Sequence, residues 1–311
     1  MVIGMRRIIL VVVALSMVLF SHRVDAHVTD TARTWNFLEF RAKFAPDLGV
    51  RIRPEHIYEH YRRDGEPLQT TEYYVYAGIF YDLPVSKYFM LNYALDYCYK
   101  GMPVHSKYRD TSWQSNYPYE HAVYVWVTPT VLLGDFIIQT RLALYNQLFI
   151  GNTERWRGDA KLQGYDASEA SGYAATFRGM LQLSYRVTKT FEVFVGDEVF
   201  YGVFDDAETK YVPQGESGGA QNVIRTRTNN SAKIAYGTYF RRQGLQLNDV
   251  FVGINLSLTP DVLFSFQFIH EEEYNQNYDP KSELASERVR LLQINRYLSM
   301  GVTYTLDFSG K

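Results

Sequence analysis

The sequence predicts an all-β protein, a single antiparallel transmembrane β-barrel of about 10–12 strands with short periplasmic turns and long outer loops. Three observations predict this fold. Hydrophobic and polar residues alternate along most of the chain, and the charged residues in mid-strand belong to the polar face. Short connections between the alternating segments are followed by long ones. No segment after residue 26 is long and apolar enough to be a spanning helix, so any membrane crossing must use strands.

The N-terminal segment has the pattern of a secretory signal peptide. A basic start with Arg6 and Arg7 precedes an apolar run at 8–20, and small residues close the segment at Val24 and Ala26. The run is shorter than the roughly 20 residues of a membrane-spanning helix. We therefore expect a signal peptide at 1–26 and a mature, mildly acidic barrel at 27–311, with an uncleaved anchor as the alternative.

The composition excludes several classes of protein. With 311 residues and a formal net charge of −2, the chain is no strongly basic nucleic-acid binder. Its single cysteine, Cys98, cannot form a disulfide framework or a CxxC redox pair. We expect no cofactor and no metal. The 26 Tyr, 19 Phe and 4 Trp exceed what an ordinary globular chain carries, and they suit the aromatic girdles of a membrane barrel.

The period-two pattern is clearest at 88–100, where Leu91, Tyr93 and Leu95 alternate with Asn92 and Asp96. Segments of this kind are often longer than the usual strands of soluble sheets and suffice to cross a bilayer when tilted. About eleven segments show the pattern: 35–44, 48–61, 72–82, 88–100, 119–129, 136–149, 173–187, 190–201, 247–259, 262–271 and 289–308.

The connections between these segments fall into two groups. Short connections are expected on the periplasmic side of a membrane barrel, and long ones outside. The barrel wall is expected over about 34–308. The short connections are 45–47, 83–86, 133–135, 188–189 and 260–261, and the long ones are 101–118, 151–172, 202–245 and 272–288.

The strand count meets a parity problem. If all short turns are periplasmic and the last strand ends there, eleven strands leave residue 34 outside, whereas an exported N-terminus should start in the periplasm. Because single-chain bacterial barrels usually have even numbers of strands, we expect either ten strands or, in preference, twelve with an additional strand at 231–243.

Charged residues in the middle of the strands should point into the lumen, because facing lipid would cost a few kcal/mol each. In a barrel of this size, mixed charges can pair across the lumen and plug it, or they can line a narrow pore. The expected lumen charges are Glu39, Arg41, Lys43, Arg51, Arg53, Glu55, Glu59, Asp96, Lys100, Arg141, Arg178, Arg186 and Glu192.

Two groups of carboxylates stand apart from this pattern. Asp197 and Glu198 are adjacent in mid-strand, so they should point to opposite faces unless Gly196 hosts a β-bulge; a wet position at the rim is the simpler alternative. Glu271, Glu272 and Glu273 close a strand and form a candidate rim site for a cation, with a solvated acidic loop start as the simpler interpretation.

The histidines give no clear chemical site. His56, Tyr58 and His60 share a face with apolar residues, and two strand residues four apart lie about 13 Å apart, so interface anchors are expected rather than a zinc site. His121, beside Glu120 and near Ser115 in the adjoining loop, is the one candidate base for a lipid hydrolase.

Four short stretches stand out: Trp35 with Glu39, the strands 178–185 and 196–200, and 252–254. Together they resemble a family of bacterial outer-membrane barrels catalogued as a porin-like domain of unknown function. The resemblance covers about 34–308 and implies fold and location without a reaction. The chain departs from the family in a longer 206–245 region and in the residues that follow the last aromatic, Phe308.

The sequence therefore predicts an exported protein of the outer membrane of a Gram-negative envelope. Its expected partners are outer-membrane lipid, lipopolysaccharide and the barrel assembly machinery, with no nucleic acid, and its oligomeric state stays open. The first hypothesis for its role is a narrow channel for small polar solutes. The alternatives are a structural or surface-interaction barrel that uses its long loops, an outer-membrane lipid-modifying enzyme, and a soluble exported barrel.

Overall fold

The computed structural model describes residues 29–62, 68–101, 104–106, 119–151, 165–205, 208–213, 224–227, 244–275 and 290–309. The predicted signal peptide and the segment 231–243 lie outside these ranges. Within these ranges, no helix has the length and apolar character to cross a membrane.

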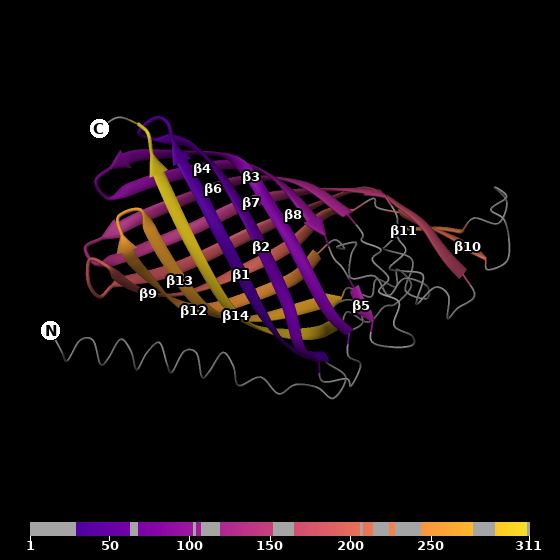
Figure 1. Ribbon diagram of the computed structural model, residues 1–311. Coiled ribbons are helices and arrows are strands. Elements are labelled where there is room, and N and C mark those ends of the chain that lie inside the picture. Colours follow the sequence, from indigo (N-terminus) through magenta and orange to yellow (C-terminus); the bar gives the residue numbers. More distant parts are fainter. Residues whose placement is uncertain are drawn as a thin grey trace.

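The described chain is all-β, and its strands close into a barrel (Figure 1). The ring runs in the order β8-β7-β6-β4-β3-β2-β1-β14-β13-β12-β9 and closes by pairing β9 with β8. The barrel expected from the sequence is thus confirmed, with eleven strands in the wall. The wall strands are β1 (Thr29–Lys43), β2 (Leu48–Arg62), β3 (Leu68–Ser86), β4 (Phe89–Gly101), β6 (Tyr119–Leu133), β7 (Phe136–Gly151), β8 (Tyr165–Arg186), β9 (Phe191–Asp205), β12 (Gly244–Thr259), β13 (Val262–Asn275) and β14 (Arg290–Asp307).

The ring closes through one parallel pair. β1 and β14 run side by side in the same direction, from Thr29 opposite Gln293 to Lys43 opposite Asp307, and the other neighbours in the wall are antiparallel. An odd number of strands forces this arrangement, because the first and last strands then point the same way. The expectation of an even number of strands was therefore wrong. A parallel closing pair allows eleven strands, so neither a ten-strand nor a twelve-strand barrel is needed.

The two ends of the barrel differ as the connection lengths predict. At the end that we call the turn end, on the left of Figure 1, short links join the strands, such as Lys87–Tyr88, Gly134–Asp135 and Pro260–Asp261. Gly134 adopts a positive φ of 65°, a conformation that favours glycine in such a tight turn. The opposite end, the loop end, carries the long connections.

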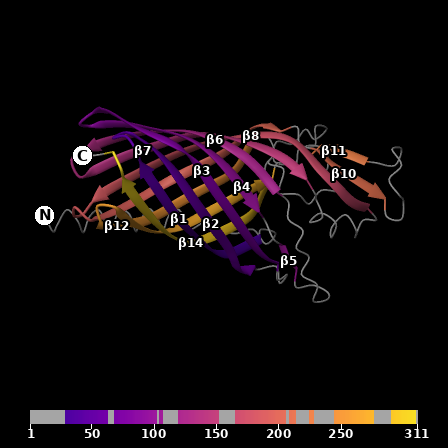
Figure 2. The ribbon, with the colours of Figure 1, turned by 45° about the horizontal axis from the view of Figure 1, so that its top comes forward.

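Three short strands lie in segments that the sequence analysis assigned to loops. β5 (Val104–Ser106) pairs with the start of β3, β10 (Glu208–Pro213) pairs with the first part of β8, and β11 (Ile224–Arg227) pairs with β10. Figures 1 and 2 show β10 and β11 extending past the loop end of the barrel. These segments lack a long alternating pattern, so their sequence did not distinguish them from loops.

The two faces of the wall have opposite chemistry. On β4, Leu95 and Tyr97 each keep 46% of their surface exposed on the outer face, whereas Asp96 and Cys98 point inward and have 0% exposed. The buried core therefore sits inside the barrel. It consists of apolar groups, such as the cluster around Phe194 and Phe251, interleaved with ionised side chains.

Candidate functional site

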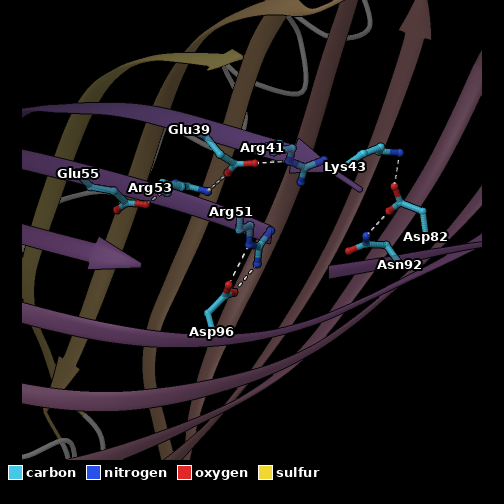
Figure 3. A network of polar contacts seen from close by, with 9 residues as sticks. All are labelled: Glu39, Arg41, Lys43, Arg51, Arg53, Glu55, Asp82, Asn92 and Asp96. Atoms are coloured by element: carbon cyan, nitrogen blue, oxygen red, sulfur yellow. Dashed lines mark hydrogen bonds and ion pairs between the residues drawn. The ribbon is translucent and has the colours of Figure 1, made fainter. Parts of the chain in front are cut away.

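The turn-side half of the lumen contains a network of ion pairs (Figure 3). Glu39 on β1 binds Arg41 of the same strand and lies 3.7 Å from Nη1 of Arg53 on β2. Arg53 also places Nε 2.6 Å from Oε1 of Glu55, and Trp35 donates from Nε1 to Glu55 over 3.0 Å. Because alternate residues of a strand share a face, Arg51, Arg53 and Glu55 all reach this network from β2.

Two further pairs extend the network across neighbouring strands. Arg51 binds both carboxylate oxygens of Asp96 on β4, a bidentate geometry that suits the planar guanidinium. Nearer the turns, Lys43 lies 2.9 Å from Asp82, and Asn92 donates to the same carboxylate. Side chains from β1 to β4 are thereby joined inside the barrel, as Figure 3 shows.

A second group of contacts centres on Glu198 of β9. Its carboxylate accepts hydrogen bonds from Arg141 of β7 over 2.7 Å and from Arg178 of β8 over 3.2 Å. Both guanidinium groups also lie against the ring of Trp126 on β6, at 4.9 and 5.4 Å from its centroid, and Arg51 of β2 approaches the same ring at 5.9 Å. Trp126 thus connects arginines from distant parts of the wall.

The loop-side half of the lumen has its own network. Arg33 on β1 lies 3.0 Å from Glu59 and 4.0 Å from Glu72, and Lys100 on β4 lies 3.3 Å from Glu72. Arg33 also donates to the hydroxyl of Tyr297 on β14 over 3.1 Å. These contacts connect β1, β2, β3, β4 and β14, and they lie closer to the loop end than the first network does.

Solvent reaches the two networks unequally. The turn-side arginines Arg41, Arg53 and Arg141 keep 29, 28 and 25% of their side chains exposed, whereas Arg33 and Lys100 of the loop-side network keep 9% each. The carboxylates that pair with these three arginines are covered to at least 94%. These three arginines are therefore more exposed than the cations of the loop-side network.

A row of acidic residues crosses three adjacent strands in the lumen. Glu198, Asp249 and Glu271 lie directly opposite one another on β9, β12 and β13. Asp249 is close enough to both Glu271 and Glu198 to interact with them electrostatically. Glu271 also accepts hydrogen bonds from Asn295 and Tyr297, at 2.6 and 2.9 Å.

Most of the charges predicted to face the lumen lie there. Arg186, in contrast, is the last residue of β8 and is exposed at the edge of the barrel, opposite Glu192. Exposure at a strand end is the physical reason why it joins neither network. The predicted charges that lie in the networks are Glu39, Arg41, Lys43, Arg51, Arg53, Glu55, Glu59, Asp96, Lys100, Arg141 and Arg178.

The adjacent carboxylates Asp197 and Glu198 point to opposite faces. Glu198 is buried in the lumen, and Asp197 is exposed on the outer face beside Leu181 and Val250. The register of β9 with β8 and with β12 continues without a shift at Gly196, so no β-bulge turns Asp197 and Glu198 toward the same face. Asp197 is the seventh of fifteen residues in β9 and does not lie at a rim.

The candidate rim site at Glu271, Glu272 and Glu273 is not assembled, which corrects the sequence-based hypothesis. Alternation sends Glu271 into the lumen, and Glu272 lies on the outer face, where its carboxylate accepts a hydrogen bond from Tyr274 and lies 3.7 Å from His270. Among the described residues, no cluster of three or more His, Cys, Asp or Glu is arranged to hold a metal ion.

The histidines His56, His60 and His121 lie on the outer face of the wall. His56 stacks on Tyr73 with ring centroids 4.8 Å apart, and His60 shares a hydrogen bond of 3.0 Å with Thr34. His121 bonds through Nδ1 to the hydroxyl of Tyr97 over 2.6 Å. Its proposed partner Ser115 lies outside the described residues.

Sequence reasoning missed the aromatic part of the lumen. Tyr124 stacks between Trp126 and Tyr145, at centroid distances of 5.0 and 4.0 Å, and Tyr145 has 0% of its surface exposed. Asp249 and Arg33 were missed as well. Their positions in the alternation, on the same face as other inward residues of their strands, were the signal that could have found them.

Comparison of the sequence with known proteins does not assign the chain to a family. The chain matches no model of a known protein family, and a search of curated proteins finds no match.

Proposed function

We propose that the protein is a bacterial outer-membrane barrel whose lumen is closed to the flow of solutes and that acts as a structural or surface-interaction barrel through its long loops. The observation that carries the proposal is the mutual pairing of lumen charges from distant strands. This favours the surface role over the narrow channel that was expected first from the sequence.

The outer face supports a membrane location. Large apolar side chains remain exposed on most strands of the wall, for example Ile79 on β3, Leu142 on β7 and Leu181 on β8, each with about half of its surface free. Aromatic residues such as Tyr88 and Tyr201 lie near the strand ends, where membrane barrels carry their girdles. An exposed apolar band of this extent requires lipid or a partner to cover it.

The lumen supports a closed barrel. Asp96, Tyr145 and Gln147 have 0% exposed surface, so no water column passes along their side chains. Glu198 holds Arg141 and Arg178, and breaking buried pairs of this kind costs about 3–5 kcal/mol each. A solute would have to break several such pairs at once, because they come from the wall itself and not from a movable loop.

Single-channel recording in planar bilayers tests the closed lumen. We expect purified wild-type protein to insert without steady conductance, and a double variant Arg178→Ser with Glu198→Ser to show discrete openings because it removes the central pair. A stable conductance of the wild-type protein would instead support the channel function.

Surface labelling tests the location. An epitope inserted in the long connection at 214–223 should be detected on intact cells, whereas the same epitope between Pro260 and Asp261 at the turn end should be detected only after the outer membrane is opened. Detection of both, or of neither, on intact cells contradicts the proposed orientation.

A further inference from the structure

We propose that the turn-side lumen binds a phosphate group of a small water-soluble molecule. The site is the arginine cluster, which we define as Arg41, Arg51, Arg53, Arg141 and Arg178. The proposal goes beyond the closed barrel, because it assigns a ligand to a part of the lumen where three arginine side chains keep a quarter or more of their surface exposed.

The cluster is held together by shared partners. Arg41 and Arg53 both contact Glu39, and Arg51, Arg141 and Arg178 surround one ring, that of Trp126. Arg53 on β2 is also close enough to Arg141 and Arg178, on the other side of the ring of strands, to interact with them electrostatically. The five arginines thus form one group that spans the lumen.

Four carboxylates contact the five arginines, and a fifth, Asp249, interacts electrostatically with Arg178. Acidic groups therefore match the arginines in number, and what distinguishes the arginines is their exposure. The side chains of the four contacting carboxylates are covered to at least 94%, whereas Arg41, Arg53 and Arg141 keep 29, 28 and 25% of their side chains exposed. The four carboxylates are Glu39, Glu55, Asp96 and Glu198.

Unpartnered donors point to the same place. The indole Nε1–H of Trp126 and the Nε–H of Arg141 are both buried and have no hydrogen-bond partner among the described residues. The guanidinium of Arg141 lies 4.9 Å from the Trp126 ring centroid, so the two donors are neighbours. Buried donors cost free energy unless an acceptor meets them, and a ligand with several oxygen acceptors can meet both.

Phosphate fits these donors better than a carboxylate does. Three terminal oxygens can accept from several guanidinium groups at once, and the planar fork of arginine binds such oxygens in a bidentate manner. Arg41 uses Nε for Glu39, its guanidinium lies over the Phe80 ring at 5.0 Å from the centroid, and 29% of its side chain is exposed. The source is a solute and not a lipid headgroup, because the site lies inside the wall.

Calorimetric titration of the detergent-purified full chain with inorganic phosphate tests the proposal, with acetate as the carboxylate probe. We expect saturable binding of phosphate, weaker binding of acetate, and a change of tryptophan fluorescence that is lost in Trp126→Phe. Absence of saturable phosphate binding, or equal binding of the two anions, overturns the assignment.

Two variants locate the site. Arg141→Gln and the more exposed Arg41→Gln should each weaken phosphate binding about tenfold or more, because each removes charged donors. Lys100→Gln is the matched control, since it removes one lumen cation of the loop-side network and should leave binding unchanged. Heat-dependent gel mobility checks that each variant folds. Loss of binding in Lys100→Gln, or full binding in folded Arg41→Gln and Arg141→Gln, contradicts the site.

Discussion

The backbone of Gly78 lies directly against the carboxylate of Asp96, its partner across the β3–β4 pair. A Cβ at position 78 would collide with Oδ1 of Asp96 and with the carbonyl of Leu95. The missing side chain lets Asp96 lie flat on the inner wall, where both of its oxygens face Arg51 of β2. A glycine on one strand therefore sets the geometry of an ion pair between two others.

Gly78→Ala should lower the free energy of unfolding by about 1–3 kcal/mol, because the new methyl group overpacks the wall and displaces Asp96 from Arg51. Urea unfolding of protein refolded into lipid vesicles measures the change. Gly179→Ala is the control: its Cβ would meet the ring of Phe177 at 3.2 Å, which can move, and a methyl group of Val199 at an ordinary contact distance of 3.8 Å. Equal destabilisation by both variants contradicts the explanation.

Glu198→Ala should destabilise the barrel by about 3–5 kcal/mol, because it leaves Arg141 and Arg178 as buried cations without their acceptor. Glu192→Ala, on the same strand near the turn end, should change stability by less than about 1 kcal/mol, since that carboxylate is only partly buried and accepts one hydrogen bond from Asn255. The same unfolding assay compares the two, and a small effect of Glu198→Ala would show that the central pair is dispensable.

Asp197→Val should stabilise the protein in lipid vesicles by about 1–2 kcal/mol if the outer face contacts lipid, because a carboxylate there is costly. Val199→Asp, at the next outward position of β9, is the reciprocal variant and should destabilise by a similar amount. Thermal or urea unfolding in vesicles reports both. A loss of stability in Asp197→Val would indicate that Asp197 has a polar partner outside the barrel.

Leu38→Cys with Val302→Cys should form a disulfide in a Cys98→Ser background, because Leu38 and Val302 are directly opposite in the parallel β1–β14 pair. A mobility shift on non-reducing gels, or mass spectrometry, detects the bond. Leu38→Cys with Leu298→Cys shifts the register by four residues, about 13 Å along the strand, and should not cross-link. Cross-linking of the second pair alone would mean that the seam has a different register.

The wall was predictable because each of its segments carries its own period-two pattern. The stretch 88–100, for example, assigns Leu95 and Tyr97 to one face and Asp96 to the other without knowledge of any neighbour, and the structure places them so. The same local rule separated Asp197 from Glu198. Information of this kind is contained within a single strand.

Pairing between strands was not predictable in the same way. That Arg53 meets Glu39 and Glu55, or that Arg178 reaches Glu198, depends on the relative shift of neighbouring strands and on the curvature of the barrel. The candidate cation site at Glu271 to Glu273 failed for a local reason, since adjacent strand residues cannot converge. The eleven alternating segments agree with the eleven wall strands, but the preference for an even number was wrong because it assumed an antiparallel closure. The direction of the closing pair is a property of the whole ring.

The parallel seam also governs how the chain could be re-engineered. Since β1 enters at one mouth of the barrel and β14 leaves at the other, Thr29 and Ser309 are separated by the full height of the wall. Joining them would take a connector of about 50 Å, the reach of fifteen extended residues, through a filled lumen or along the outer wall. Circular permutation suits barrels whose two chain ends lie at the same mouth, so it is not feasible here. Tags fused at Thr29 and Ser309 would instead report on opposite sides of the membrane.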